Sequence, residues 1–285
     1  MIEELVGLKD YPIARRGVIM TSLISGLTLA TTRVEAQAIT TPTAGLVAGT
    51  VTIPTSQGDI PAYRAKPHGK GPFPVVLVIE EIFGVHAHIQ DVCRRLAKEG
   101  YLAVAPELYA RIADLSTMTD AAVIIRDVIS KAPDERVLKD LDETAGWAAT
   151  DGGDLSRLAV TGFCRGGRNT WLYDAHNPAI KAAVAWYGPV GGAPSDIQPK
   201  TATDVADRLH APLLGLYGGK DPGIPVEAVQ AAAAKARAAG KTVEIEVFPE
   251  APHGFHADYR PSYRPDAAAA GWTRMLAWFR GNGVG

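Results

Sequence analysis

The chain has 285 residues, with 29 Lys and Arg against 31 Asp and Glu, so its formal net charge is −2. Hydrophobic residues make up 47% and charged residues 21% of it, which excludes a disordered chain, a collagen-like chain and a protein with several membrane spans. No Lys/Arg block indicates a nucleic-acid partner. Two cysteines, Cys93 and Cys164, are too few for a disulfide scaffold or a cysteine-rich metal site.

The first 38 residues differ from the rest. Arg15 and Arg16 precede a mildly apolar run to about Thr32, and the small-x-small sequence 36–38 (Ala-Gln-Ala) follows. This order is typical of a twin-arginine export signal, so we expect residues 1–38 to direct the protein to the periplasm or outside the cell. The apolar run is too short and too polar to span a bilayer stably. The alternative is a disordered leader or a later start at Met20, which would leave the protein in the cytoplasm.

Residues 39–49 are rich in Thr, Ala and Gly and are predicted to be a linker to one domain at 50–285. A hairpin is expected first, with strands at 50–53 and 60–65 around the turn 56–59. The continuous apolar run 73–79 predicts a strand buried on both faces. A helix with apolar residues at helical spacing follows and ends at Gly100, and another buried strand is expected at 101–106.

Helices and strands continue to alternate to the end of the chain. The expected order is helices at about 119–131 and 134–150, strand 158–161, helix 165–176, strands 182–186 and 213–217, helix 225–239, strand 243–248 and helix 266–280. This alternation predicts one α/β domain, in which a mostly parallel sheet carries helices on both faces. No internal repeat is visible.

A nucleophile motif follows the strand expected at 158–161. The sequence 162–167 (Gly-Phe-Cys-Arg-Gly-Gly) has the pattern Gly-x-nucleophile-x-Gly, with Cys164 in the place of the more usual serine. A turn this sharp strains the nucleophile and requires glycine beside it. It also places the thiol at a helix N-terminus, where the dipole favours the thiolate. The alternative is a buried structural cysteine in an ordinary glycine turn.

A carboxylate and an imidazole follow two later strands. Asp221 comes after the strand at 213–217, and His253 comes after the strand at 243–248. In open α/β sheets the chemistry lies beyond the carboxyl ends of the strands, and the order nucleophile, acid, base is that of α/β-hydrolases. Asp221 alone could be a turn residue and His253 alone a solvated loop histidine. The three in this order predict a Cys164-His253-Asp221 triad.

The remaining chemical residues carry weaker signals. Cys93 lies on the apolar side of its helix and is expected to be a core residue. His86, His88 and His256 could suggest metal ligands, but nothing completes a tetrahedral set, so we expect no metal ion and no cofactor. Glu80 and Glu81 end a buried strand, and because successive side chains point to opposite faces, only one is expected to reach the site. There it would be desolvated and could bond the thiol.

These residues together resemble the dienelactone hydrolase family (carboxymethylenebutenolidases) from about Ile60 to the C-terminal helix. The motifs that carry the resemblance are 81–84 (Glu-Ile-Phe-Gly), 106–111 (Pro-Glu-Leu-Tyr-Ala-Arg), 162–167, 218–221 (Gly-Gly-Lys-Asp) and 253–255 (His-Gly-Phe). The resemblance implies an α/β-hydrolase fold and hydrolysis of a small lactone or ester. It implies the same triad, with Glu81 holding the resting thiol and turning away when substrate binds. It also implies an oxyanion hole built from the main-chain N–H groups of Ile82 and Arg165.

The implied reaction is acyl transfer through a thioester on Cys164, with His253 moving the proton and activating water. The family binds the carboxylate of dienelactone with arginines, one of them four residues after the histidine, but here that residue is Ala257. Arg260 and Arg126 are the candidates to replace these arginines. The departure leaves two alternatives open, a broad carboxylesterase or thioesterase of the same fold, and a non-enzymatic ligand-binding protein. The oligomeric state is not predicted.

Overall fold

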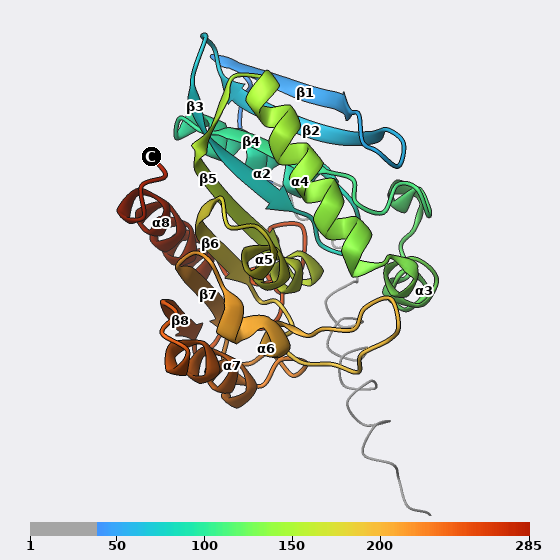
Figure 1. Cartoon of the computed structure of the whole chain (residues 1–285), viewed down its shortest axis with the longest axis vertical. Helices are drawn as coiled ribbons and strands as arrows, with labels where there is room; N and C mark the ends of the chain where they lie inside the picture. The colour runs from blue at the N-terminus through green and yellow to red at the C-terminus, as the bar shows by residue number, and fades with distance from the viewer. Residues whose placement is uncertain (1–38) are drawn as a thin grey trace, which may run out of the picture.

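The computed structural model describes residues 39–285, and within them eight strands form one sheet in the order β1-β2-β4-β3-β5-β6-β7-β8 (Figure 1). β1 and β2 pair antiparallel with each other, β2 pairs antiparallel with β4, and every other neighbouring pair is parallel. The predicted mostly parallel sheet is therefore confirmed. The strands are β1 (Leu46–Ile53), β2 (Ile60–Pro67), β3 (Phe73–Ile79), β4 (Leu102–Pro106), β5 (Gly153–Phe163), β6 (Ile180–Trp186), β7 (Leu213–Gly218) and β8 (Val243–Phe248).

Helices cover both faces of this sheet, because each right-handed crossover places its helix according to the direction in which the strand order moves. In Figure 1, α4, α5, α6 and α7 lie on the face toward the viewer, and α2 and α8 lie behind it. The helices are α2 (Ala87–Lys98), α3 (Ala121–Asp127), α4 (Asp134–Thr150), α5 (Arg165–His176), α6 (Ala202–Val205), α7 (Val226–Ala238) and α8 (Pro265–Gly281). Short 3₁₀ turns lie at η1 (Leu115–Thr117), η2 (Ile129–Lys131) and η3 (Ala206–Arg208).

The core lies on the central parallel strands. Six of the seven residues of β3 and all five of β4 are buried, as expected for strands covered on both faces. Cys93 is fully buried on α2, which confirms that it is a core residue, and burial raises the pKa of its thiol. In the part of the chain that the structure describes, no helix is long and apolar enough to cross a membrane.

The segment predicted as a linker at 39–49 differs from that prediction. β1 begins at Leu46, because Leu46–Gly49 pair with Arg64–Pro67 of β2. Before it, the main chain of Ile39 and of Thr41 is hydrogen-bonded to the buried carboxylates Asp258 and Asp91. These residues are part of the folded domain. The predicted export signal at 1–38 lies outside the described residues.

Candidate active site

Cys164 occupies a strained turn between β5 and α5. Its φ of 54° and ψ of −114° lie outside the conformations that an L-residue readily adopts. The main-chain N–H of Cys164 donates to the carbonyl of Trp186 (3.0 Å), and its own carbonyl accepts from Gly167 and Arg168 in the first turn of α5. Neighbouring strand and helix thus hold the strained residue from both sides and fix the thiol at the N-terminus of α5.

Glycine is required beside Cys164 because the main chains approach closely. A Cβ atom on Gly166 would lie 2.3 Å from the carbonyl oxygen of Ile79, and one on Gly162 would lie 2.3 Å from the carbonyl oxygen of Gly166. Both contacts are with main chain, which cannot rotate away as a flexible side chain could. The motif 162–167 is therefore imposed by the packing of the turn against β3.

His253 and Asp221 meet on the loops after β8 and β7. The Nδ1 atom of His253 lies 2.6 Å from Oδ2 of Asp221, and both side chains are buried. Burial alone would lower the pKa of His253, but the charge of Cys164 and the bond to Asp221 outweigh it and raise this pKa to about 10. The imidazole therefore lies within electrostatic range of the thiol on one side and is held by a carboxylate on the other.

Glu81 is held in a buried cluster with Arg260 and Tyr259. Its Oε2 accepts hydrogen bonds from the Tyr259 hydroxyl (2.5 Å) and from Nη2 of Arg260 (3.2 Å). Burial alone would raise the pKa of Glu81, but the charge of Arg260 and the nearby His86 ring hold it well below its usual range. The guanidinium of Arg260 lies 5.0 Å from the centre of the Phe83 ring. Burial alone would lower the pKa of Arg260, but the charge of Glu81 outweighs burial and raises it. The contact expected between Glu81 and the resting thiol is not among these bonds and stays a prediction.

Several buried polar atoms around this cluster have no hydrogen-bond partner among the described residues. Among them are Glu81 Oε1, His86 Nε2, Tyr187 Oη, His253 Nε2 and Arg260 Nη1. Tyr187 and Arg260 each lie within electrostatic range of both Cys164 and Glu81, so these groups lie close to one another. Because buried polar atoms are rarely left unpaired, such a convergence is typical of a site that a polar ligand completes.

The expected oxyanion donors lie on the turns that flank this space. The N–H of Arg165 is at the first position of α5, where a helix offers no acceptor, and that of Ile82 lies just after β3. Across residues 39–285 neither N–H donates to another protein group. Both are therefore available to a ligand.

The other predicted residues have different places. Arg126 is exposed on α3 and pairs with its neighbour Asp127, and the structure does not bring it to the predicted triad. His86 is at the N-cap position of α2 with its Nε2 3.6 Å from Oε2 of Glu81, and His88 bonds Asp258 through Nδ1 at 2.9 Å. No group of three or more His, Cys, Asp or Glu within residues 39–285 has the arrangement of a metal site.

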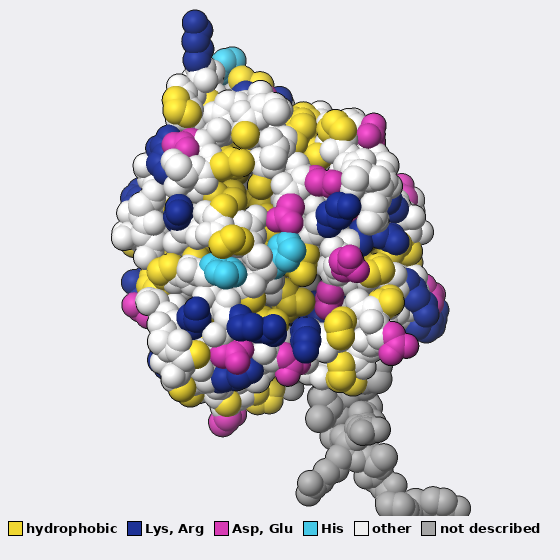
Figure 2. Space-filling model, in the orientation of Figure 1, with side chains coloured by type: hydrophobic (Ala, Val, Ile, Leu, Met, Phe, Trp, Pro, Cys, Tyr) yellow, Lys and Arg dark blue, Asp and Glu magenta, His cyan; other side chains and the backbone are white. Residues whose placement is uncertain are grey.

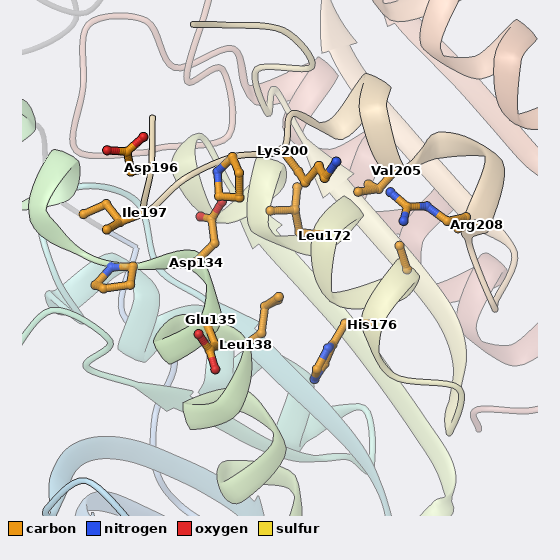
Figure 3. Close-up of a pocket in the computed structure, with 13 residues that line it drawn as sticks. Asp134, Glu135, Leu138, Leu172, His176, Asp196, Ile197, Lys200, Val205 and Arg208 are labelled. Atoms are coloured by element: carbon orange, nitrogen blue, oxygen red, sulfur yellow. The ribbon is translucent and has the colours of Figure 1, made fainter. Parts of the chain in front are cut away.

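A separate pocket of about 450 Å³ lies between α4, α5 and the 196–208 region (Figure 3). Asp134 and Glu135 line it from α4, and Leu172 and His176 line it from α5. No triad residue contributes to it, and Asp134 is already bound in two places by Arg168, at 2.8 and 2.7 Å. This pocket therefore lies apart from the predicted triad. On the face drawn in Figure 2, charged side chains of both signs are interspersed with apolar ones.

The motif search missed Tyr259 and Tyr187. Tyr187 directly follows β6, so the rule that points to Cys164, Asp221 and His253 would also have found it. Tyr259 carries no such signal, because its place depends on the path of the loop after His253.

A family model described as "Dienelactone hydrolase family" matches residues 60–282. The chain belongs to the dienelactone hydrolase family. This dienelactone hydrolase homologue is 57% identical over 274 residues to a Methylorubrum extorquens protein named "Putative carboxymethylenebutenolidase", a match that covers 95% of this chain and 94% of the relative. An Escherichia coli protein of the same name is 51% identical over 257 residues, with 90% and 95% covered.

Solved structures agree with this family and fold. The crystal structure of a "Putative Dienelactone Hydrolase" from Klebsiella pneumoniae is 54% identical, with a TM-score of 0.81, and covers 82% of this chain and 98% of its own. A hyperthermophilic esterase from Pyrobaculum calidifontis, 19% identical with a TM-score of 0.61, covers 96% of this chain and 95% of its own and shares the fold. The predicted α/β-hydrolase fold is therefore confirmed, and the protein is a carboxylic-ester hydrolase of the dienelactone hydrolase family.

Proposed function

We propose that this hydrolase cleaves a small lactone or ester through a thioester on Cys164. The observation that carries the proposal is the strained Cys164 at the start of α5, within electrostatic range of a histidine that Asp221 holds. Helix dipole and imidazolium both favour the thiolate, which is the nucleophilic form. The raised pKa of His253 keeps the imidazolium as a proton donor at neutral pH.

The reaction proceeds in two halves. The thiolate of Cys164 attacks the carbonyl carbon, and the N–H groups of Ile82 and Arg165 bind the resulting oxyanion. The intermediate expels the alcohol or enol oxygen, which takes the proton from His253. His253 then removes a proton from water, and the hydroxide attacks the thioester and expels the Cys164 thiolate, with His253 left as imidazolium. The product leaves as a carboxylic acid and loses its proton to solvent.

Glu81 and Arg260 are proposed to govern how substrate enters. Before substrate binds, the proton lies on the Cys164 thiol and the free Oε1 of Glu81 would accept its S–H; when Glu81 turns away, the proton passes to His253 and leaves the thiolate-imidazolium pair that starts the reaction. The free Nη1 of Arg260 is the atom that would bind a substrate carboxylate. A second carboxylate on Arg260 would weaken its hold on Glu81 and release the thiol as substrate arrives. Arg126 has no part in this proposal, because it lies exposed on α3.

Alkylation tests the nucleophile. Iodoacetamide should modify Cys164 and abolish hydrolysis of an aryl ester, and Cys164→Ala should be inactive, whereas the matched variant Cys93→Ala should keep its activity and its labelling at Cys164. A substrate that deacylates slowly should add one acyl group to the wild-type protein, measured by intact mass after acid quenching. Full activity in Cys164→Ala, or an adduct on another residue, would overturn the mechanism.

The second candidate is a broad carboxylesterase or thioesterase, favoured by the buried Ala257 at the place where the family has a carboxylate-binding arginine. Dienelactone, neutral aryl esters and acyl thioesters assayed side by side separate the two. A kcat/KM for dienelactone at least tenfold above the others supports the lactonase. A kcat/KM for neutral esters or thioesters at least tenfold above that for dienelactone supports the alternative. Cys164→Ala is the control for every substrate.

We also propose that the chain is exported by the twin-arginine route and cleaved after Ala38, so that the folded enzyme works outside the cytoplasm. Its support is the sequence of residues 1–38. Export of an already folded domain would keep the thiol of Cys164 in its buried site during transit. The intact mass of the protein from the exported fraction tests this, because a chain that begins at Met1 contradicts cleavage.

A further inference from the structure

The first residues that the structure describes are fastened to α2 and to the loop after β8. The main-chain N–H of Ile39 donates to Oδ2 of Asp258 at 2.9 Å. Two residues later the N–H of Thr41 donates to Asp91, and the carbonyl of Thr41 accepts from Arg94 at 3.0 Å. Ile39 and Asp258 are 219 positions apart, so this contact belongs to the tertiary fold.

Asp258 is an ionised carboxylate at the edge of the core. It is 4% exposed, and its two oxygens contact Nδ1 of His88 (2.9 Å) and Nη2 of Arg95 (3.0 Å) in addition to the Ile39 N–H. Burial alone would raise the pKa of Asp258, but these neighbours outweigh it and lower the pKa. The N–H of Ile39 therefore points at a negative charge.

This carboxylate is joined to the active site by its own chain. The two residues after Asp258 are Tyr259 and Arg260, which hold Glu81. The ring of His88, bonded to Asp258, lies 5.6 Å from the ring of Tyr259. Whatever holds Asp258 in place therefore also holds the loop that connects His253 to Arg260.

The small-x-small sequence at 36–38 would be cut after Ala38, which makes Ile39 the first residue of the processed chain. Its nitrogen would then be an ammonium group, at the place where the uncut chain has a neutral amide. We propose that the new α-ammonium of Ile39 forms an ion pair with Asp258, so that removal of the leader locks the loop carrying Tyr259 and Arg260. The pairing requires that Ile39 be the first residue, since a cut one residue earlier would place the ammonium on Ala38, about 3.8 Å away along the chain.

The groups that face this nitrogen allow the pair. Asp258 attracts it, and Arg95, which shares the same carboxylate oxygen, repels it. Asp91 offsets Arg95 through its bond to Nε at 2.6 Å. Tyr263 lies within electrostatic range of Asp258 and is neutral near pH 7, because burial and Asp258 raise its pKa. Ile39 itself is 45% exposed, so water screens the repulsion between its ammonium group and Arg95 more than it weakens the direct contact with Asp258.

Three chains test the proposal, one beginning at Ile39, one at Ala38 and the full chain from Met1. The first two can be released from a fusion whose protease leaves no extra residue. The shorter chains keep every strand and helix of the described fold, and the Klebsiella pneumoniae relative crystallised as a chain matching only 82% of this one. The Ala38 chain is the matched control, because it retains the Ile39 N–H but displaces the charge.

The Ile39 chain should melt about 2–4 °C above the Ala38 chain at pH 7. An ammonium paired with a carboxylate has a raised pKa. The stability advantage of the Ile39 chain should therefore be full below about pH 8, the ordinary pKa of an α-amino group, and should vanish as the pH rises past the raised pKa of the paired group. Amide exchange of residues 254–264 should be slower in the Ile39 chain, and exchange of α7 should be equal in all three. Equal melting temperatures together with equal exchange would overturn the ion pair.

Asp258→Asn provides the second control, and it should erase the difference between the Ile39 and Ala38 chains. If that variant does not fold, titration of the α-amino group of the Ile39 chain decides instead, with a pKa about one unit above 8 supporting the pair and an ordinary value refuting it. The inference rests on the proposed processing for its occurrence in the cell. A mass beginning elsewhere than Ile39 would refute the processing, whereas equal stability of the purified chains would refute the ion pair alone.

Discussion

The buried carboxyl group of Glu80 and the half-buried one of Glu107 join the loop after β3 to the loop after β4, next to the turn that carries Ile82. Oε1 of Glu80 accepts from the N–H of Leu108 (2.9 Å), and Oε1 of Glu107 accepts from the N–H of Val85 (3.2 Å). Burial and the charge of Glu107 raise the pKa of Glu80 well above its usual range. Glu80 therefore holds its proton to a higher pH than an ordinary carboxyl group does, and burial also raises the pKa of Glu107 beside it.

This proton makes stability depend on pH. Below the ordinary carboxyl pKa, about 4.3, the folded and unfolded chains both hold it, and above that value only the folded chain does. The raised pKa thus contributes stability that is full at low pH and is lost as pH rises toward the folded value. Between the unfolded and the folded pKa of Glu80, the free energy of unfolding should fall with rising pH by about 1.4 kcal/mol per unit from this group.

Glu80→Gln tests the raised pKa, because the amide oxygen can accept from the N–H of Leu108 as the carboxyl oxygen does, without a titrating proton. Urea unfolding at pH 5, 6 and 7 should show the variant gaining stability on the wild type as the pH rises, by up to about 1.4 kcal/mol per unit. Glu99→Gln is the control, since Glu99 is a surface residue paired with Arg280, and its difference from wild type should stay flat. Parallel pH dependences for Glu80→Gln and wild type would refute the raised pKa of Glu80.

Three further predictions follow from the site. Asp221→Asn should lower kcat by about 10³–10⁴-fold and move the alkaline limit of the pH–rate profile below 10, because the carboxylate helps to raise the pKa of His253; an unchanged alkaline limit would contradict this. Arg260→Met should destabilise the fold by about 3–5 kcal/mol in urea, because it leaves Glu81 as a buried charge without a cation. Adding Glu81→Gln to Arg260→Met should recover most of the lost stability. If it recovers none, the broken Glu81–Arg260 ion pair is not the cause of the loss. Gly166→Ala should lower the melting temperature sharply by forcing main chain apart, whereas Gly146→Ala, which meets open space on α4, should stabilise by about 1 kcal/mol; equal effects would contradict the close approach.

The fold could be predicted where local pattern and tertiary environment agree. β3 has the predicted bounds, because seven consecutive residues are suited to a strand covered on both faces. β5 is longer than predicted, since its polar start at Gly153–Arg157 becomes a strand only through its register with β3, which shifts between Pro74 and Val75. α6 has four residues and a capping box at Thr201, too short to give a helical period.

The candidate site likewise has a part that could be predicted from the sequence and a part that could not. Cys164, Asp221 and His253 could be found because each follows a strand on the same edge of the sheet, and a parallel sheet brings such positions together. The pairing of Glu81 with Arg260 and Tyr259 could not, because it depends on the turns through which the chain after His253 folds back. The sequence predicts Arg260 only as a substrate-binding residue. Its bond to Glu81 could not be predicted, because it joins residues 179 positions apart.

The strain at Cys164 explains why the chemistry is easier to find than the substrate. A residue at φ 54° costs about 1–3 kcal/mol, and it persists only because β6, α5 and the main chain of β3 close around it. That closure demands glycine at fixed places, so the reaction leaves a local motif in the sequence. The unpaired Nη1 of Arg260 and Oη of Tyr187 come from separate loops, and although Tyr187 also has a positive φ of 36°, no fixed sequence spacing relates the two residues. On the proposed mechanism, selectivity among lactones, esters and thioesters therefore depends on these long-range contacts and not on the motif around Cys164.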